Sequence, residues 1–282
     1  MFVATGSVRP ADATSQTPQP ELNVFVSVDM EGLAGVAAAS EVSPTGPDYG
    51  HFRAIMAAET NAAVEGAFRA GATRVLVRDS HGSKTNLLPG DVSPRAQLLR
   101  GASSGPKNMM EGIDATFGAA VFIGYHAKAG TPNAVLAHTS NGNVIDFEIN
   151  GISLPEAGYN ALVAGLYNVP VVFVAGDRAF VEQARGLLGP VEAVATKAEI
   201  GGGATSSLSP AEAQRQIQAG VERAVRGRAR VKPYTMTSPY TMVLKVRVER
   251  PMHRNAERVR NGEFVFKHPD LLEVLTAFNA MK

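Results

Sequence analysis

Apolar runs alternate with longer amphipathic segments along most of the chain. Runs of β-branched, aromatic and small apolar residues predict four buried strands, at about 23–28, 73–79, 119–127 and 169–177. The pattern over roughly 51–70 predicts a helix that ends at Gly71, and a second helix is expected to begin near Pro155. Strands that alternate with helices predict an α/β fold, with a central, mostly parallel sheet flanked by helices.

The last third of the chain has a different pattern. Ser209, Pro210 and Glu212 form a capping box at the head of a predicted helix. Residues 241–249 alternate between apolar and polar, which predicts a strand with one solvated face, and residues 269–278 predict a closing helix. We therefore expect a catalytic α/β domain over residues 22–190 and a smaller C-terminal α+β lobe over residues 191–282.

The first segment, residues 1–21, is rich in Pro, Ser, Thr and Ala and has no periodicity, which predicts a flexible N-terminal tail. It lacks the apolar core of a signal peptide, so we expect a cytoplasmic protein, although a mature exported form that has lost its signal is also compatible with the sequence. No apolar run approaches the roughly 18 to 20 residues that span a bilayer.

Composition narrows the chemistry. Lysine and arginine number 27 against 26 acidic residues, so the charge balance gives no reason to expect nucleic acid or a membrane as the main partner. The chain has no cysteine, which excludes disulfides and thiol catalysis. Any metal ion must therefore be held by histidine, aspartate or glutamate.

Potential metal ligands follow three of the apolar runs. Asp29 and Glu31 come after the first, Asp79 and His81 after the second, and His126 after the third. Binding sites of parallel α/β sheets gather at the carboxyl ends of the strands, so these side chains are expected to converge in one crevice.

Glu156 would add a carboxylate from the start of a helix. Mixed imidazole and carboxylate ligands suit zinc, with manganese or iron as second choices. Two ions would explain the paired acids, because one carboxylate can bridge both. Taken singly, Asp29 and Glu31 could instead be a turn acid and a helix N-terminal acid, and His81 and His126 a loop and a core histidine.

Five short motifs carry a resemblance to a known family. They occur in the order SVDMEG, DSHG, GYHA, AHTS and PEAGYNALVAG. In this order and approximate spacing they resemble the DppA-type zinc-dependent D-aminopeptidases, first associated with dipeptide-transport operons. The resemblance is specific from Asn23 to Asp177 and weaker towards the C-terminus.

The resemblance implies a site and an activity. The residues that it assigns to two zinc ions per chain are Asp29, Glu31, His81, His126 and Glu156. Asp29 is our choice for the bridging carboxylate, and His138 matches the histidine that acts as nucleophile or base. The implied reaction is removal of N-terminal D-amino acids from short peptides such as D-Ala-D-Ala. Zinc would polarise the scissile carbonyl, and an unligated histidine could attack or move protons.

Relatives of this family assemble into ring-shaped homodecamers built from pentamers, so the resemblance also implies a large homo-oligomer. Two other functions stay open on the sequence. The first is a metallo-aminopeptidase or amidase acting on L-peptides or amino-acid amides, and the second is a non-catalytic, metal-dependent peptide-binding protein. His138 argues against the binding protein, which needs no unligated histidine beside the metal.

Overall fold

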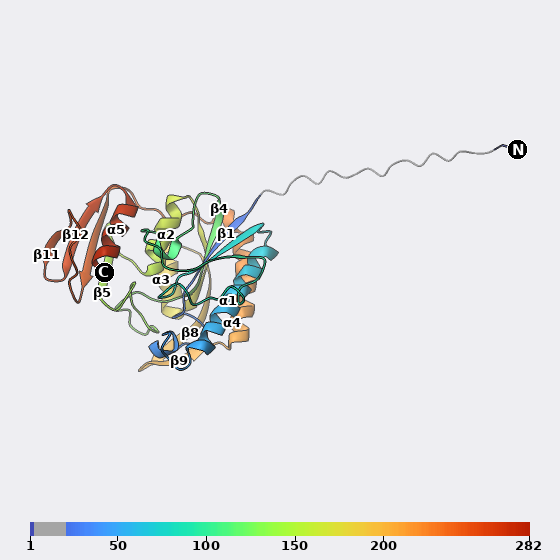
Figure 1. The fold of residues 1–282 in the computed structure, drawn as a ribbon, viewed down its shortest axis with the longest axis horizontal. Coiled ribbons are helices and arrows are strands. Elements are labelled where there is room, and N and C mark those ends of the chain that lie inside the picture. Colours follow the sequence, from blue (N-terminus) through green and yellow to red (C-terminus); the bar gives the residue numbers. More distant parts are fainter. Residues whose placement is uncertain (3–20) are drawn as a thin grey trace.

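The computed structural model describes residues 1–2 and 21–282, so the predicted N-terminal tail lies almost wholly outside the described residues. A seven-stranded sheet forms the centre of the molecule (Figure 1). In spatial order its strands are β3 (Gln97–Leu99), β2 (Arg74–Asp79), β1 (Asn23–Val28), β4 (Phe117–Tyr125), β7 (Val171–Asp177), β8 (Glu192–Gly201) and β9 (Ala204–Ser207). Only the edge strand β9 is antiparallel to its neighbour, which confirms the predicted, mostly parallel α/β sheet.

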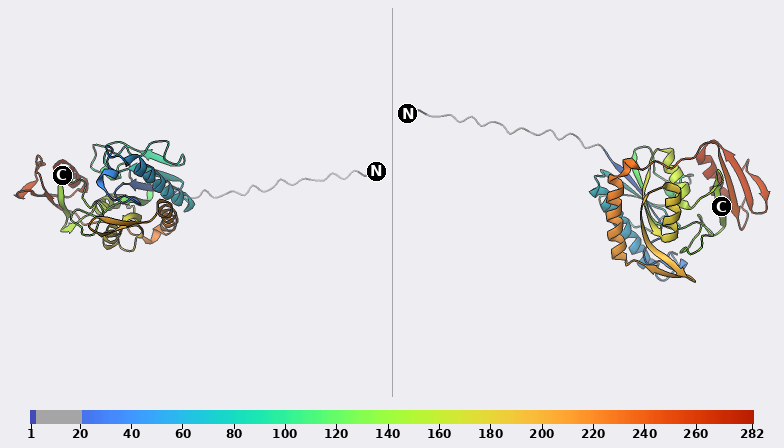
Figure 2. Two further views of the ribbon diagram at one scale, coloured as in Figure 1. Left: turned by 90° about the horizontal axis from the view of Figure 1, so that it is seen from below. Right: turned by 180° about the vertical axis from the view of Figure 1, so that it is seen from behind.

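Helices cover both faces of this sheet (Figure 2). The four are α1 (Tyr49–Arg69) and α4 (Pro210–Arg226) on one face, and α2 (Glu156–Leu166) and α3 (Arg178–Leu188) on the other. Alternate residues of β1 serve the two faces, because successive side chains of a strand point in opposite directions. Val24 and Val26 pack in the core beneath α1 and α4, whereas Phe25 joins the core beneath α2.

A second, antiparallel sheet of five strands forms a smaller lobe beside α2 and α3. Its strands, in spatial order, are β11 (Glu257–Arg260), β12 (Glu263–His268), β10 (Tyr240–Val246), β5 (Val144–Ile149) and β6 (Ile152–Ser153). The C-terminal helix α5 (Leu271–Met281) covers it. Phe147 of β5 stacks on Phe278 of α5 and meets Tyr159 of α2, so one apolar core joins the lobe to the main sheet.

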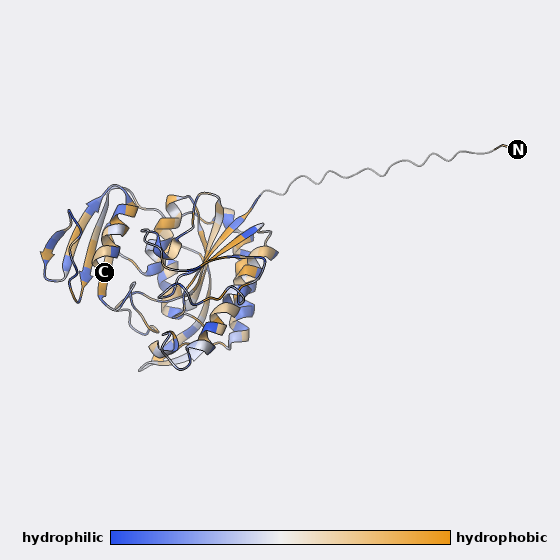
Figure 3. Ribbon diagram, in the orientation of Figure 1, coloured by the Kyte–Doolittle hydropathy of each residue, from blue (hydrophilic) through white to orange (hydrophobic). Residues whose placement is uncertain are grey.

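Short 3-10 turns complete the described structure, at η1 (Ala39–Glu41), η2 (Asn108–Met110) and η3 (Arg228–Arg230). The strands at the centre of the main sheet are mostly apolar, whereas the helices that cover the sheet mix apolar and polar residues (Figure 3). Among the described residues, none of the helices combines the length and the apolar character that crossing a membrane requires. The cytoplasmic location stays a prediction.

The two sheets do not follow the boundary expected at residue 190. From beyond it, β8, β9 and α4 belong to the seven-stranded sheet, while β5 and β6 from before it belong to the five-stranded sheet. The reason is that β7, α3 and β8 form one further parallel crossover unit, which extends the main sheet past residue 190. Whether residues 22–190 and 191–282 fold as separate domains stays a prediction.

The order of the strands creates a crevice at the sheet's centre. From β1 the chain runs outwards through β2 to β3, and β4 then returns to the other side of β1. Ligands of open α/β sheets bind at such a switch point, beyond the carboxyl ends of the strands. The loops that follow β2, β1 and β4 therefore meet at the place where a binding site is expected.

Candidate metal centre

The structure brings the predicted site residues together at this crevice. Asp29 and Glu31 follow β1, His81 follows β2 and His126 follows β4, in three loops that leave neighbouring strands. Glu156 is the first residue of α2, which begins after Pro155 as predicted. The prediction that the ends of three separate strands converge is therefore confirmed.

Glycines allow these loops to cross at short range. The Gly32 amide donates a 2.7 Å hydrogen bond to the Gly124 carbonyl. A Cβ atom added at Gly32 would lie 1.9 Å from the Tyr125 carbonyl oxygen, and one at Gly124 would lie 2.1 Å from that of Asp29. Gly124 also has a φ of +70°. Gly32 and Gly124 each belong to a sequence motif. Glycine is required at both positions because the two loop backbones pack directly against each other beside the acidic residues.

His81 lies between the two acids that follow β1. Its Nδ1 is 3.1 Å from Asp29 Oδ1 and 3.1 Å from Glu31 Oε2, and its Nε2 donates to the Val42 carbonyl at 2.8 Å. A carbonyl only accepts, so Nε2 carries a proton and Nδ1 faces two carboxylates. Burial alone would lower the pKa of His81, but the charges of Glu31 and Asp29 and their hydrogen bonds raise it to about 11.

The same contacts act on Glu31. Burial would raise its pKa, but the neighbouring charge and hydrogen bond of His81 hold it well below its ordinary value. Positive charge between the acids of this loop is therefore strongly favoured, and a proton on His81 or a bound cation supplies it.

His126 faces a second pair of carboxylates. Its Nδ1 donates to the Ala127 carbonyl at 3.0 Å, which leaves Nε2 directed at Asp29 Oδ2 and Glu156 Oε1, each 3.6 Å away. This buried Nε2 has no hydrogen-bond partner among the described residues. Burial would lower the pKa of His126, but the charges of Glu156, Glu31 and Asp29 raise it. An unpaired imidazole nitrogen beside two carboxylates is the environment of a metal ligand.

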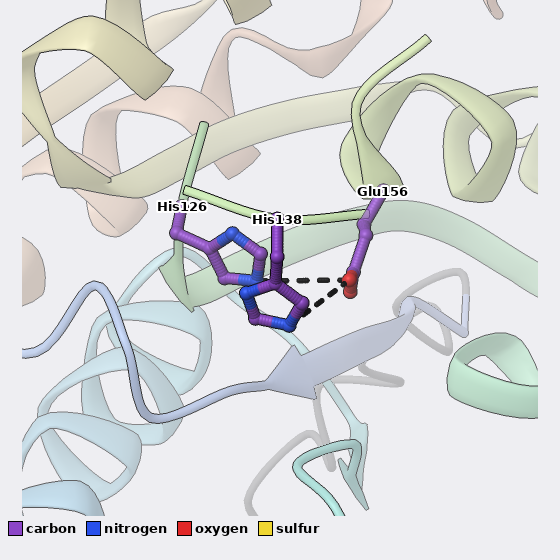
Figure 4. A group of neighbouring side chains, drawn as sticks. All are labelled: His126, His138 and Glu156. Atoms are coloured by element: carbon purple, nitrogen blue, oxygen red, sulfur yellow. Dashed lines mark ion pairs between the residues drawn. The ribbon is translucent and has the colours of Figure 1, made fainter. Parts of the chain in front are cut away.

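His138 lies over His126, with the two rings stacked 4.0 Å apart (Figure 4). Its Nδ1 donates to the Leu136 carbonyl at 2.9 Å, and its Nε2 is 3.7 Å from Glu156 Oε1. The Glu156 oxygen also accepts a 2.6 Å hydrogen bond from the Ser140 amide. The side chain of His138 is 28% exposed, against 11% for His81 and 0% for His126, so it is the most accessible of the three.

The donor atoms fit a zinc centre. Among the described residues, two overlapping sets of three side chains place their ligand atoms within 4.8 Å of one another: Asp29, Glu31 and His126, and His126, His138 and Glu156. Imidazole nitrogen and carboxylate oxygen at this spacing are the ligands of zinc. The orphaned Nε2 of His126 gives such an ion a site that no hydrogen bond in the described structure fills.

A cavity of about 280 Å³ opens onto this centre. Asp29, Glu31, His81, His138 and Glu156 all contribute to its wall. A larger hollow of about 770 Å³ lies beside α3 and the β8–β9 turn, and none of the predicted site residues lines it. Glu31 and His138 also line a separate hollow of about 360 Å³. The 280 Å³ cavity carries more of the predicted site residues, so it is the main space in which chemistry at the centre can reach a ligand.

Asp79 was predicted to converge with the other candidate ligands, and this prediction is wrong. Asp79, at the end of β2, accepts hydrogen bonds from the Asn86 side chain at 2.8 Å and from the Leu87 amide at 2.8 Å. Its carboxylate thus fastens the loop that carries His81 and does not face the other acids. In the sequence, an aspartate that ends a strand looks the same whether its carboxylate accepts hydrogen bonds from the following loop or binds a metal ion.

No sequence pattern predicted a role for Lys197, whose side chain holds the loop after β1 in place. This buried lysine of β8 donates to the carbonyl of Glu31 and, at 2.6 Å, to that of Val36. Burial lowers its pKa to about 8, against the opposing charges of Asp177 and Glu59. Its position in an alternating strand gave no signal, because its contacts lie more than 160 residues away in sequence.

The mixed imidazole and carboxylate set, open to a small cavity on one side, is the kind of centre used by metal-dependent hydrolases. Residues 22–280 match the family model described as D-aminopeptidase, and the chain belongs to this family. Over 225 residues it is 39% identical to the D-aminopeptidase of Bacillus subtilis (strain 168), a match that covers 80% of this chain and 81% of that protein.

The fold agrees with this assignment. It is similar to the solved structure of the Zn-dependent D-aminopeptidase DppA from Bacillus subtilis, described as a self-compartmentalizing protease, with a TM-score of 0.87 and 34% identity. That similarity covers 92% of this chain and 96% of the solved chain. The family resemblance carried by the five sequence motifs is therefore confirmed.

The role of Lys197 generates a test of the loop's support. The substitution Lys197→Met leaves the buried carbonyls of Glu31 and Val36 without their donor, so we expect it to lower the free energy of unfolding by at least about 2 kcal/mol. Urea denaturation measures this. The exposed Lys267 offers a matched control, and Lys267→Met should change the value by less than about 0.5 kcal/mol. An equally small change in Lys197→Met would contradict the assigned role.

Proposed function

We propose that this chain is a two-zinc aminopeptidase that removes N-terminal D-amino acids from short peptides such as D-Ala-D-Ala. The observation that carries the proposal is the position of Asp29. Its Oδ1 faces the Nδ1 of His81 at 3.1 Å, and its Oδ2 faces the Nε2 of His126 at 3.6 Å. One carboxylate directed at two separate imidazoles is arranged as a bridge between two cations.

The remaining ligands divide around this bridge. Glu31 and His81 complete one set with Asp29, because His81 Nδ1 is 3.1 Å from Glu31 Oε2. Glu156 and His126 complete the other set, because His126 Nε2 is 3.6 Å from Glu156 Oε1. The Zn-dependent relative supports zinc as the metal, and the count of two ions per chain rests on the two-sided position of the bridge.

His138 is proposed as the catalytic residue. It is the most exposed of the three histidines and lines the cavity, so a bound substrate can touch it. Its Nδ1 proton is engaged by the Leu136 carbonyl, which leaves the Nε2 lone pair free to attack a carbonyl carbon or accept a proton. Bound zinc supplies Lewis-acid polarisation of the carbonyl of the scissile bond.

The substrate class follows from the metal centre and from the family. An aminopeptidase must recognise a free N-terminus, and the metal centre would receive the neutral amine of the substrate, because zinc accepts nitrogen ligands. The cavity of about 280 Å³ lies at the small end of ligand pockets, which supports short substrates. The preference for D-residues rests on membership of the D-aminopeptidase family.

The proposal extends to assembly. The similar Bacillus subtilis enzyme is described as self-compartmentalizing, which supports a homo-oligomer here. We propose the ring-shaped homodecamer that the family resemblance implies. In such an assembly, small cavities like the one at this centre would open to an enclosed space and receive only peptides able to enter it.

The ligand assignment makes a prediction about metal content. His126→Ala or Glu156→Ala should lower the zinc bound by the purified protein well below two ions per chain, because each removes a proposed ligand. His138→Ala should keep its zinc, because His138 is proposed to act without binding metal, although its ligand atom lies within 4.8 Å of those of His126 and Glu156. Mass spectrometry of the metals measures this, with the exposed His51→Ala as a matched control. Full zinc in His126→Ala, or loss of zinc in His138→Ala, would contradict these roles.

The activity is tested by comparing D-alanine p-nitroanilide with its L-enantiomer. We expect hydrolysis of the D-form, and a fall of about 100-fold or more in kcat for His138→Ala, because a positioned acid–base group or nucleophile is removed. Release of p-nitroaniline is followed by its absorbance. Hydrolysis of the L-form alone would replace the substrate with L-peptides or amino-acid amides, and a lack of turnover in both would favour the peptide-binding protein.

A further inference from the structure

Two lysines line the same cavity as the candidate metal centre, and the proposed reaction gives neither of them a role. Lys84 lies in the loop that follows β2, and Lys282 follows α5 in the smaller lobe. The lobe therefore completes the wall of the cavity with a positive charge. Neither residue belongs to a sequence motif that predicted the site.

These ammonium groups have no carboxylate partner. Within residues 1–2 and 21–282, the lysines with an ion pair of 4.0 Å or less are Lys128 and Lys245, both outside this cavity. Lys84 donates one hydrogen bond, to the Ser80 carbonyl, although an ammonium group has three donors. The ammonium group of Lys282 lies 5.1 Å from the centroid of the Phe278 ring, a contact that engages its charge without forming a hydrogen bond to a carboxylate. Donor capacity is thus left over on the cavity wall.

Burial makes this arrangement unfavourable without an anion. The side chains of Lys84 and Lys282 are both half-buried. Burial, opposed by the charge of Glu156, lowers the pKa of Lys282 to about 8, and the charge of Lys84 adds to the lowering. Two ammonium groups that affect each other in a partly desolvated cavity form a site that a negative group would stabilise.

The backbone at Lys84 also has an unusual conformation. Among the described residues, eight other than glycine have a positive φ, and five of these are asparagine. The other three are Lys84 at +63°, Leu136 and Ser140, and the latter two lie on either side of His138. A residue with a Cβ atom is disfavoured in this region, and such strain concentrates at functional sites. Lys84 therefore shares an unusual feature with the segment that positions the proposed catalytic residue.

A short peptide that is free at both ends has two groups that this cavity complements. Its N-terminal amine suits the metal centre, and its α-carboxylate suits the two lysines. We propose that Lys84 and Lys282 bind the free α-carboxylate of the substrate, so that the cavity selects short peptides, dipeptides above all, by both of their ends. This inference rests on the proposed aminopeptidase function, and it adds the residues that bind the C-terminal carboxylate of the substrate.

The first test compares D-alanyl-D-alanine with its C-terminal amide, using the wild-type enzyme loaded with zinc. The amide keeps the scissile bond and the ammonium group but lacks the negative charge. We expect kcat/KM for the free acid to exceed that for the amide by about tenfold or more, because a site built for a charged group rejects an analogue without it. Equal values for the two substrates would overturn the proposal, and this comparison needs no variant.

Variants locate the effect. Lys84→Gln and Lys282→Gln should each reduce the acid-to-amide ratio by about tenfold, with the loss falling mainly on the acid. Lys267→Gln, an exposed lysine of the same lobe as Lys282, should retain the wild-type ratio. If the ratio is unchanged in both cavity variants, the lysines do not read the carboxylate and the proposal fails.

A binding measurement separates recognition from turnover. Calorimetric titration of the acid and the amide into His138→Ala should show tighter binding of the acid, and Lys84→Gln in that background should remove the difference. D-alanine p-nitroanilide has no carboxylate. Its hydrolysis therefore distinguishes failure of the carboxylate site from failure of the proposed aminopeptidase function. If the wild type hydrolyses it but treats acid and amide alike, only the carboxylate site is wrong. If the wild type hydrolyses neither it nor the dipeptide, the proposed function fails and this inference fails with it.

Discussion

One electrostatic constraint governs the site, because the carboxylates of Asp29, Glu31 and Glu156 are gathered and buried at one edge of the central sheet. Carboxylates in such a place need compensating positive charge. Backbone amides of Met30 and Ser140 donate to two of these carboxylates. Among the described residues, the ionisable groups that approach the acids within 3.1 to 3.6 Å are the imidazoles of His81 and His126. That arrangement places protons or metal ions between the acids, and the unpaired Nε2 of His126 favours metal.

The fold imposes this constraint through the order of its strands. Because β2, β1 and β4 lie side by side, the loops after them must share one space. Gly32 and Gly124 let the loop backbones cross, and Lys197 ties the loop after β1 to β8. The positions of the acids are therefore fixed by backbone packing and hydrogen bonds of residues that are not themselves proposed ligands. A preorganised metal site requires such support.

The central part of the fold and the grouping of the candidate ligands could be predicted because their signals are local. Asp29 follows its apolar strand directly in the chain, and the parallel arrangement then sets where it lies. Lys197 and Lys282 could not be found this way, because their partners are distant in sequence and depend on how β8 and α5 pack. Asp79 shows the opposite error, since it shares the local signal of a ligand but bonds its own loop. The extent of the main sheet was missed for the same reason as the lysines, because pairing of β8 with β7 leaves no mark in the sequence of either strand.

The most direct test of the central claim is removal of the metal from the purified protein, with activity, melting temperature and circular dichroism measured together. We expect chelation to abolish hydrolysis of D-alanine p-nitroanilide and to lower the melting temperature, because a ligand that binds only the folded state stabilises it. The helix and strand content should remain, since the apolar core does not involve the centre, and added zinc should restore the activity. Activity and melting temperature that stay unchanged in protein shown to be free of metal would contradict the claim that a cation holds these acids together.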